Sequence, residues 1–563
     1  MCGIFAVLGS TLPRDQLLQL TINATNKLQH RGPDDLQTYV SPDGWAALGF
    51  ARLQINDPEH GAQPMHISDD TIWAVTNGEI YNHRHLRSTD LHGQQLHSNS
   101  DCEVIAPLYE KYATSLFPHD LSHLYNTLKG VFASVVVDLA RNQFVAARDP
   151  IGVRAMYLGR SEDGAVWIAS EAKALLDHCN HVTPFLPGCY YAAKRGQENA
   201  SEFKPYYNPL FYNPGWLPTE RVNLQKLHDS FKQACVRRLM SDVPVGVFIS
   251  GGLDSSLVAS VLKKALPSDY VFHSFSCGLE GSPDLKAAQR VADFLGTEHH
   301  VLTFTVEDGI RALEDVVYHL ETYDITTIRA STPMYLLSKL VKQYVKVVLS
   351  GEGADEVFGG YLYFHNADSE KDFYEETVRR VKLLYTADVL RGDRSTAAQS
   401  LELRVPFLDR DFLDVAMCYS AVDKMTGKGR RIEKWAIRQA FSEEFSGEQY
   451  LPDDILMRPK EQFSDGVGYN WIDGLKDYCD EQITDKMMRD AATTFKHDPP
   501  ATKEAYYYRS LFEKIFGKYE GAQGLREGVH KWIPLWSDSD DPSGRAQRFH
   551  TAAYVKTMNG HST

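Results

Sequence analysis

A cysteine at the second position of the chain could act as a nucleophile once the initiator methionine is removed. Cys2 is followed by Gly3 and by the apolar segment 4-IFAVLG-9. Without Met1, the thiol would stand beside a free α-amine, and an amine with a pKa of about 8 can serve as its general base. The alternative is an inert cysteine buried near the start of a strand. Cys2 alone does not decide between the two.

Two glycine-rich loops in the second half of the chain have the composition of a phosphate site. The first, 250-SGGLDSS-256, stands between an apolar strand and a helix, where backbone N–H groups and a helix N-terminus bind phosphate oxygens. It is not a Walker A loop, because it lacks the GxxxxGK[ST] pattern. The second, 350-SGEGADEVFGGY-361, also follows an apolar strand. We expect both loops at one crevice of a parallel sheet; the alternative for the second is a turn with solvated acids.

The elements before about residue 205 form one predicted domain. Short apolar and β-branched runs, separated by Gly, Asp and Asn, predict layered β-sheets with a few helices. The clearest runs are 72-IWAVT-76, 131-VFASVVVDL-139 and 166-VWIAS-170. Leu18, Ile22 and Leu28 recur at helical spacing and predict a helix over about 14–29.

A second domain is predicted after the proline-rich linker 205-PYYNPLFYNPGWLP-218. From about residue 220, apolar strands alternate with amphipathic helices, which predicts a parallel sheet with crossover helices. Strands are expected at 243–250, 270–278 and 345–351, and helices at 256–266, 284–296 and 309–321, with mainly helices after about 365. The predicted domains are therefore 2–205 and 220–535, followed by an irregular tail at 536–563.

Composition excludes several classes of protein. The 563 residues are 43% hydrophobic and 24% charged, which is typical of a globular protein with large cores. A net charge of −15 argues against non-specific binding to nucleic acid or anionic membranes, although a local basic pocket for phosphate is compatible with it. The eight cysteines form no CxxC pair and no zinc spacing, and no long apolar run is present. We therefore expect a cytoplasmic, soluble protein without a structural metal.

The N-terminal motifs resemble those of the class II glutamine amidotransferases in order and spacing. They are Met1-Cys2-Gly3-Ile4, 30-HRGPD-34, 77-NGEIYN-82 and 148-RDPIGVR-154. The resemblance implies a layered Ntn-type αββα glutaminase domain in which Cys2 attacks glutamine, while the Asn77 side chain and the Gly78 N–H stabilise the oxyanion. For 77-NGE-79 taken alone, the alternative is a hairpin turn with a solvated acid.

The same resemblance implies a glutamine pocket. Arg52 would bind the α-carboxylate of glutamine, and Asp101 and Glu79 would bind its α-amine. The implied glutamine-binding residues are Arg52, Leu53, Gln54, Ile55, Asn77, Gly78, Glu79 and Asp101. Arg31 would stand on the product side of the site, and His30 is assigned to positioning rather than to base catalysis.

The loop 250-SGGLDSS-256 resembles that of the PP-loop ATP pyrophosphatases, which cleave ATP to AMP and pyrophosphate. The resemblance implies an α/β parallel-sheet synthetase domain with added helices. Asp254 would bind Mg²⁺, and Asp355 is the expected second ligand, because Mg²⁺ favours one or two carboxylates together with phosphate oxygens. The residues that would grip the pyrophosphate are Ser250, Gly251, Gly252, Ser255 and Ser256.

Nearly the whole chain resembles the glutamine-dependent asparagine synthetases. The further segments that carry this resemblance are 321-ETYDITTIRAS-331, 388-DVLRGDRSTAA-398, 401-LELRVPFLD-409 and 458-RPKEQFSDG-466. It implies that Phe248 and Cys277 line the adenine site, that Ser350 and Gly351 contact the nucleotide, and that Glu352 accepts a proton near the acyl-adenylate. Asp388, Arg391 and Lys460 would hold aspartate and developing charge, although Asp388 and Arg391 could instead form an ordinary ion pair.

The resemblance predicts an ATP- and Mg²⁺-dependent carbon–nitrogen ligase that is a homodimer. Ammonia released at Cys2 would attack β-aspartyl-AMP to give asparagine, with glutamate, AMP and pyrophosphate as the other products. One alternative keeps both half-sites but uses another carboxylate acceptor, as in enzymes that close a β-lactam ring. Another is a catalytically silent homologue that only binds ligands. His365 and the acidic run 368-DSEKDFYEE-376 are expected at the solvated surface.

Overall fold

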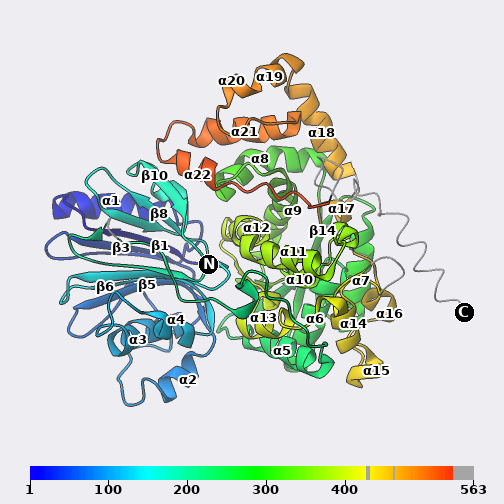
Figure 1. Cartoon of the computed structure of the whole chain (residues 1–563), viewed down its shortest axis with the longest axis horizontal. Helices are drawn as coiled ribbons and strands as arrows, with labels where there is room; N and C mark the ends of the chain where they lie inside the picture. The colour runs from blue at the N-terminus through cyan, green and yellow to red at the C-terminus, as the bar shows by residue number, and fades with distance from the viewer. Residues whose placement is uncertain (199–200, 427–430, 461–462, 469, 537–563) are drawn as a thin grey trace, which may run out of the picture.

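The computed structural model describes residues 1–536, apart from 199–200, 427–430, 461–462 and 469. The tail predicted for 536–563 therefore lies outside the described residues, except for Trp536. In Figure 1 two stacked sheets at the N-terminal end lie beside a larger α/β part. Within the described residues, we find no helix with the length and apolar composition that a membrane crossing requires.

The N-terminal domain stacks two antiparallel sheets between helices. The strand orders are β10-β8-β9-β1-β3-β2 and β12-β11-β7-β6-β5-β4. Helix α1 (Arg14–Asn26) packs on the first sheet and α3 (Ile105–Tyr112) on the second, which gives the predicted αββα layers (Figure 1). The strands are β1 (Gly3–Leu8), β2 (Asp35–Val40), β3 (Ala46–Arg52), β4 (Met65–Ile67), β5 (Ile72–Ile80), β6 (Gly130–Asp138), β7 (Gln143–Arg148), β8 (Tyr157–Arg160), β9 (Val166–Ala169), β10 (His181–Pro184), β11 (Cys189–Lys194) and β12 (Lys204–Pro205).

Strand β1 shows why these layers form. Successive side chains of a strand point to opposite faces of the sheet. Ile4, Ala6 and Leu8 join the core between the two sheets, whereas Phe5 and Val7 pack in the cluster that includes residues of α1. Because both faces of β1 are apolar, the strand is buried along its length, and the adjoining Cys2 is held at the start of a central strand.

The C-terminal domain is built on a parallel sheet with the strand order β15-β14-β13-β16-β17. Its strands are β13 (Val245–Phe248), β14 (His273–Gly278), β15 (Glu298–Thr303), β16 (Val347–Leu349) and β17 (Glu402–Arg404). Its larger helices are α5 (Leu224–Arg237), α6 (Leu253–Ala265), α7 (Pro283–Leu295), α8 (Val306–Leu320), α9 (Ile325–Val341), α11 (Glu370–Leu383), α12 (Asp388–Ala397), α18 (Asn470–Gln482) and α21 (Lys503–Phe516). Shorter helices include α10 (Ala354–Phe358), α13 (Arg410–Ala416), α14 (Trp435–Ala440) and α22 (Ala522–Gly528).

The strand order reverses direction at β13. From β13 the chain continues to β14 and β15 on one side, and it returns through β16 and β17 on the other. The register pairs Phe248 with Phe275 and Val247 with Leu349, so the strand ends lie together. The loops after β13 and β16 therefore meet at one edge of the sheet, as the sequence predicts.

The structure excludes one alternative and corrects one expectation from the sequence. The hairpin alternative for 77-NGE-79 is excluded, because this segment lies inside β5 and pairs with β6. The region after about residue 365 is mainly helical, as predicted, and it also contains the short strand β17, which pairs with β16 as the last strand of the sheet. The run 368–376 is not wholly solvated: Phe373, Tyr374 and Glu376 are buried, since α11 packs them inward, and His365 is half-buried.

Candidate active sites

Cys2 lies in a small pocket of the N-terminal domain. Its Sγ atom accepts a hydrogen bond from the Leu53 N–H at 3.4 Å and lies 3.7 Å from the Leu53 carbonyl oxygen. The Arg31 Nε–H donates to the Cys2 carbonyl oxygen at 2.9 Å, which fixes the backbone on the other side. The thiol is therefore held in one position at the end of β1, facing the pocket.

Most residues predicted to bind glutamine line this pocket. They are Cys2, Arg52, Leu53, Ile55, Gly78, Glu79 and Asp101. Gln54 does not line it; its backbone N–H donates to Asp34 at 2.8 Å. Asn77 is fully buried on β5 and also lies outside the lining, and neither polar atom of its amide has a hydrogen-bond partner among the described residues.

Two buried carboxylates of the pocket are tied together by an asparagine. The Asn56 amide donates to Glu79 at 2.6 Å and to Asp101 at 3.1 Å, and the Ile80 N–H donates to Asp101 at 2.7 Å. Burial raises the pKa of Glu79, an effect that the Arg404 guanidinium opposes. Among the described residues we find no carboxylate partner for Arg52: its guanidinium donates to the Pro58 carbonyl at 3.1 Å and to that of Asp57 at 2.6 Å. The pocket thus holds the carboxyl groups of Glu79 and Asp101 together and the guanidinium of Arg52 apart from them.

The N-terminal amine has an environment that favours its neutral form. Met1 is fully buried, and burial lowers the pKa of the α-amine to about 5, with Glu402 and Cys2 acting in the opposite direction. Burial raises the pKa of the Cys2 thiol, which the neighbouring amine partly offsets. The general base expected from the sequence is a different amine, that of Cys2, which becomes free only when Met1 is removed.

The larger pocket lies at the carboxyl edge of the parallel sheet. Both predicted loops line it, together with Lys460, Asp388 and Arg391. The loops are in close contact: a Cβ atom on Gly351 would lie 2.6 Å from the Ser255 nitrogen, so a larger residue would push them apart. Gly252 is the N-cap of α6 and has no side chain, which leaves the first-turn N–H groups of this helix for another acceptor.

Two of the predicted phosphate residues lie behind the pocket surface. Gly251 and Ser256 are not among the lining residues, whereas Ser250, Gly252 and Ser255 are. Gly251 has a φ of +73° and packs on α7, where a Cβ atom would lie 2.4 Å from that of Ala287. Ser256 is fully buried in α6. The predicted adenine residues Phe248 and Cys277 and the predicted nucleotide contacts Ser350 and Gly351 all line the pocket.

The two predicted metal ligands are joined by lysines. Lys434 Nζ contacts Asp254 Oδ2 and lies 2.6 Å from Asp355 Oδ1, and Lys460 Nζ lies 2.6 Å from Asp355 Oδ2. Burial would raise the pKa of Asp355, but Lys434 and Lys460 lower it to about 2. Asp254 Oδ1 is buried and has no hydrogen-bond partner among the described residues. An ionised carboxylate pair with an unpaired oxygen fits a Mg²⁺ site.

The predicted aspartate residues form a buried ionic cluster. Arg391 lies 2.6 Å from Asp388 and 2.7 Å from Glu352. The Tyr361 hydroxyl contacts Glu356 and donates to Asp388 at 3.2 Å. Burial raises the pKa of Glu352, and Arg391 opposes this shift. Asp388 and Arg391 are therefore an ion pair, as the alternative interpretation stated, and they also line the pocket.

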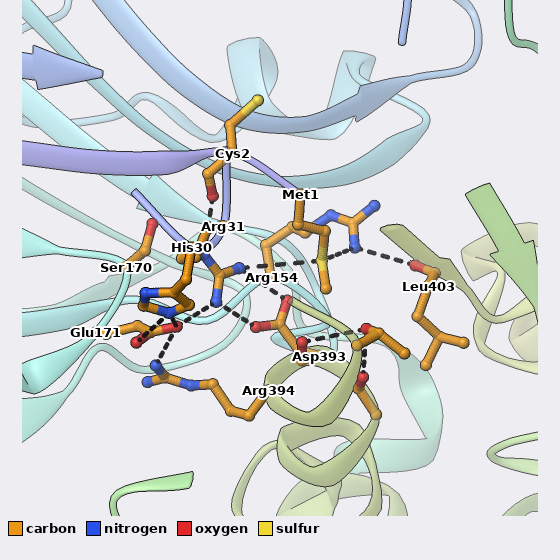
Figure 2. A network of polar contacts seen from close by, with 12 residues as sticks. Met1, Cys2, His30, Arg31, Arg154, Ser170, Glu171, Asp393, Arg394 and Leu403 are labelled. Carbon is orange, nitrogen blue, oxygen red and sulfur yellow. Dashed lines mark hydrogen bonds and ion pairs between the residues drawn. The ribbon is translucent and has the colours of Figure 1, made fainter. Parts of the chain in front are cut away.

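A network of buried charges separates the two pockets and crosses between the domains. Arg31 lies 2.7 Å from Glu171 and 3.0 Å from Asp393, and Arg394 lies 2.9 Å from Glu171, as Figure 2 shows. The Arg154 guanidinium donates to the Leu403 carbonyl at 3.1 Å, also visible in Figure 2. Arg31 is thus an anchor between the domains as well as a neighbour of Cys2.

Sequence reasoning missed residues of both pockets. In the small pocket these are Phe50, Asn56, Gly61, Gln63, Thr76, Ser100, Cys102 and Glu402, and in the large pocket they include Asp284, Glu356, Tyr361, Lys434, Arg438 and Arg458. Glu402 had a detectable signal: in 401-LELRV-405 polar and apolar residues alternate, which is typical of a strand with one charged face. We find no such periodic signal at Lys434.

The chain is similar to known proteins along nearly its full length. A family model described as asparagine synthase matches residues 226–373 and 366–537, and one described as a glutamine amidotransferase domain matches residues 1–193. Asparagine synthetase [glutamine-hydrolyzing] 1 of Arabidopsis thaliana is 47% identical over 573 residues, which is 98% of this chain and 95% of the relative. Asparagine synthetase [glutamine-hydrolyzing] 2 of Oryza sativa subsp. japonica is 46% identical over 99% of this chain and 94% of the relative.

Solved structures give a more distant likeness. One, described as the allosteric regulatory enzyme of purine biosynthesis, is 15% identical with a TM-score of 0.33 and matches 54% of this chain and 80% of its own length.

Proposed function

The chain belongs to the glutamine-hydrolysing asparagine synthetases, and from this premise we propose how its two pockets divide the reaction. The enzyme makes asparagine from aspartate and glutamine at the expense of ATP. We assign glutamine hydrolysis to a domain of residues 2–205 and the ATP-dependent step to a domain of residues 220–535. The observation that carries this division is that one chain holds two separate pockets, one with the nucleophile Cys2 on the first domain and one with the paired glycine-rich loops of the second domain.

The glutaminase step begins with removal of Met1, which frees the α-amine of Cys2. This amine takes the thiol proton, and the sulfur attacks the amide carbon of glutamine. The oxyanion accepts a hydrogen bond from the Gly78 N–H and from the Asn77 amide, whose unpaired polar atoms are available if the side chain turns toward the pocket. Ammonia leaves, and water hydrolyses the thioester to glutamate. Arg52 binds the α-carboxylate, and Glu79 and Asp101 bind the α-amine.

The synthetase step activates aspartate. The N-terminus of α6, with Ser250, Gly252 and Ser255, binds the pyrophosphate portion of ATP, while Phe248 and Cys277 line the adenine site. Arg391 and Asp388 orient aspartate so that its β-carboxylate attacks the α-phosphorus, giving β-aspartyl-AMP and pyrophosphate. Lys460 stabilises the charge that develops on the phosphate oxygens.

We propose Asp254 and Asp355 as the residues that hold Mg²⁺. When bound, Mg²⁺ would neutralise charge on the pyrophosphate. Ammonia then passes between the domains and attacks the acyl-adenylate; Glu352 accepts the proton released, a role that its raised pKa favours. AMP leaves and asparagine is formed.

The alternative with another carboxylate acceptor is disfavoured by the nearly full-length similarity to asparagine synthetases. The silent-homologue alternative conflicts with the presence of Cys2, Asp254, Asp355 and Lys460 in the two pockets.

We also propose a homodimer in the cytoplasm, with no nucleic-acid partner. The location is supported by eight free cysteines, which suit a reducing compartment. Size-exclusion chromatography with light scattering checks the dimer, because a monomeric mass at micromolar concentration contradicts it, and fractionation checks the location.

The decisive experiment supplies aspartate, ATP, Mg²⁺ and glutamine labelled with ¹⁵N in its amide. Mass spectrometry should find labelled asparagine together with glutamate, AMP and pyrophosphate. Glutamate without asparagine would remove the aspartate assignment and keep the glutaminase. Asparagine synthesis with added ammonium but not with glutamine would remove the glutaminase assignment and keep the assignment of the second pocket.

A further inference from the structure

One carboxylate of the glutamine pocket comes from the other domain. Glu402 belongs to β17, a strand of the synthetase sheet, yet it lines the pocket that contains Cys2. It is 2% exposed, and its two oxygens lie 2.7 Å from Arg404 and 3.2 Å from Arg154. The N-terminal domain therefore does not supply this pocket alone.

Arg404 lies two residues further along β17. Its side chain is outside the lining of the same pocket and contacts a lining residue. Its guanidinium lies 3.2 Å from Glu79, a residue assigned to the α-amine of glutamine, and 2.7 Å from Glu402. It also donates to the Arg238 carbonyl at 2.8 Å, so its position is fixed by the synthetase domain. Because Glu402 and Arg404 are two apart on a strand, both point to the same face.

The charges of this cluster match a zwitterionic amino acid. Glu79, Asp101 and Glu402 supply three carboxylates, and the two arginines Arg154 and Arg404 lie against them from outside the lining. One negative charge is left for an ammonium group, and Arg52, whose guanidinium donates to the Pro58 and Asp57 carbonyls, is left for a carboxylate. A purely structural interface would gain little from this arrangement, since buried ion pairs are weak sources of stability.

We propose that Glu402 and Arg404 are positioning residues of the glutaminase site, contributed by the synthetase domain. Arg404 holds Glu79 in place for the α-amine of glutamine, and Glu402 fixes Arg404 and Arg154 through its two oxygens. This inference rests on the glutaminase role proposed above. It makes glutamine hydrolysis depend on the docking of β17 against the N-terminal domain.

The test compares Glu402→Gln and Glu402→Asp with the unmodified enzyme. We expect Glu402→Gln to lower kcat/KM for glutamine hydrolysis about tenfold, the effect of losing one favourable charge contact, while ammonium-dependent synthesis stays unchanged. Glu402→Asp keeps the negative charge, so it should retain more glutaminase activity than Glu402→Gln, whose neutral amide no longer forms an ion pair with Arg404 and Arg154.

Arg404→Lys tests the second residue. Lysine keeps the charge but cannot contact Glu79, Glu402 and the Arg238 carbonyl together, so KM for glutamine should rise about tenfold with a smaller change in kcat. Asp411→Asn is the matched control: Lys129 and Asp411 form an ion pair between the domains at 2.8 Å, away from both pockets.

The outcomes separate this inference from the proposed function. Unchanged glutaminase kinetics in Glu402→Gln would overturn the inference. A parallel loss of glutaminase and ammonium-dependent synthesis, equal in Glu402→Gln and Glu402→Asp, would also overturn it, because that pattern belongs to lost stability. Absence of glutaminase activity in the unmodified enzyme would instead overturn the proposed function.

Discussion

Lys434 is the residue on which the charge balance of the synthetase pocket depends. It is 2% exposed and contacts both Asp254 and Asp355, while Lys460 contacts Asp355 from the other side. Two lysines and two carboxylates therefore alternate along one wall of the pocket. Because Lys434 and Lys460 lower the pKa of Asp355 to about 2, this carboxylate stays ionised beside the place proposed for a cation and a polyphosphate.

Replacing Lys434 by methionine should damage the synthetase step and spare the glutaminase. The change leaves two buried carboxylates without their shared cation, so ammonium-dependent synthesis should fall about 100-fold, the effect of losing one electrostatic group at a reacting phosphate. Steady-state rates of pyrophosphate release measure it. Lys514→Met, which removes an exposed ion pair with Glu314, is the control. Normal pyrophosphate release in Lys434→Met would contradict the role of Lys434.

Replacing Cys2 by alanine should abolish only the use of glutamine. Without the sulfur no thioester forms, whereas the paired-loop pocket is unaffected, so synthesis with added ammonium should continue at the normal rate. Parallel assays with glutamine and with ammonium chloride measure the difference. Glutamine-dependent synthesis that persists in Cys2→Ala would contradict the assignment of the nucleophile.

At the scale of elements, two helices are packed with no space for one added methyl group. Gly309 on α8 faces Trp471 on α18, and a Cβ atom at Gly309 would lie 2.1 Å from the indole ring. Trp471 is fully buried and donates from its indole N–H to the Arg329 carbonyl at 2.9 Å. The ring therefore cannot move away without losing a hydrogen bond.

Gly309→Ala should destabilise the protein although it improves helix propensity. Alanine in a helix interior is normally favoured over glycine by about 1 kcal/mol, but overpacking at this contact costs about 1–3 kcal/mol. Thermal unfolding of Gly309→Ala, Trp471→Phe and the double variant measures both effects. In the Trp471→Phe background, Gly309→Ala should destabilise the protein less, because the smaller phenylalanine ring leaves room for the added methyl group. An equal cost in both backgrounds would show that the indole ring is not the cause.

Elements with strong periodicity were predictable, and contacts between distant segments were not. The strand–loop–helix unit around Ser250 was predicted, because an apolar run, glycines and an amphipathic run follow one another along the sequence. Lys434 reaches the same pocket from a segment 180 residues after Asp254, and no local pattern indicates this. Glu402 was missed for a related reason: the alternation in 401-LELRV-405 indicates a short strand, but nothing local indicates that this strand pairs with β16 and lines the pocket of Cys2.

At the scale of the whole molecule, the two domains are joined by buried polar residues. Arg31, Glu171 and Asp393 meet at their contact, and His30 lies against His319 of α8 with ring centroids 4.7 Å apart. Burial, with smaller contributions from Lys173 and His30, lowers the pKa of His319 to about 3. This histidine is therefore neutral in the folded protein at all but very acidic pH.

Acidification should weaken the folded protein through His319. As pH falls below 6.5, the unfolded chain binds a proton at this residue and the folded one does not until about pH 3, so stability falls across that window by about 1.4 kcal/mol per pH unit. Thermal midpoints at pH 7 and pH 5 should drop less in His319→Phe than in the unmodified enzyme. His66→Phe, at an exposed position, is the control. An equal drop of the thermal midpoint in the unmodified enzyme, in His319→Phe and in His66→Phe would exclude His319 as the cause.

The position of Arg404 also bears on the design of chimeric enzymes. Its side chain lies against Glu79 of the glutamine pocket, while its backbone carbonyl accepts a hydrogen bond at 3.1 Å from the N–H of Ser350, the first residue of the second nucleotide loop. A transplanted amidotransferase domain would therefore need an acid that meets this arginine. A graft chosen by sequence similarity within the first domain alone would remove the Glu79 partner of this guanidinium and leave it with Glu402 of its own strand.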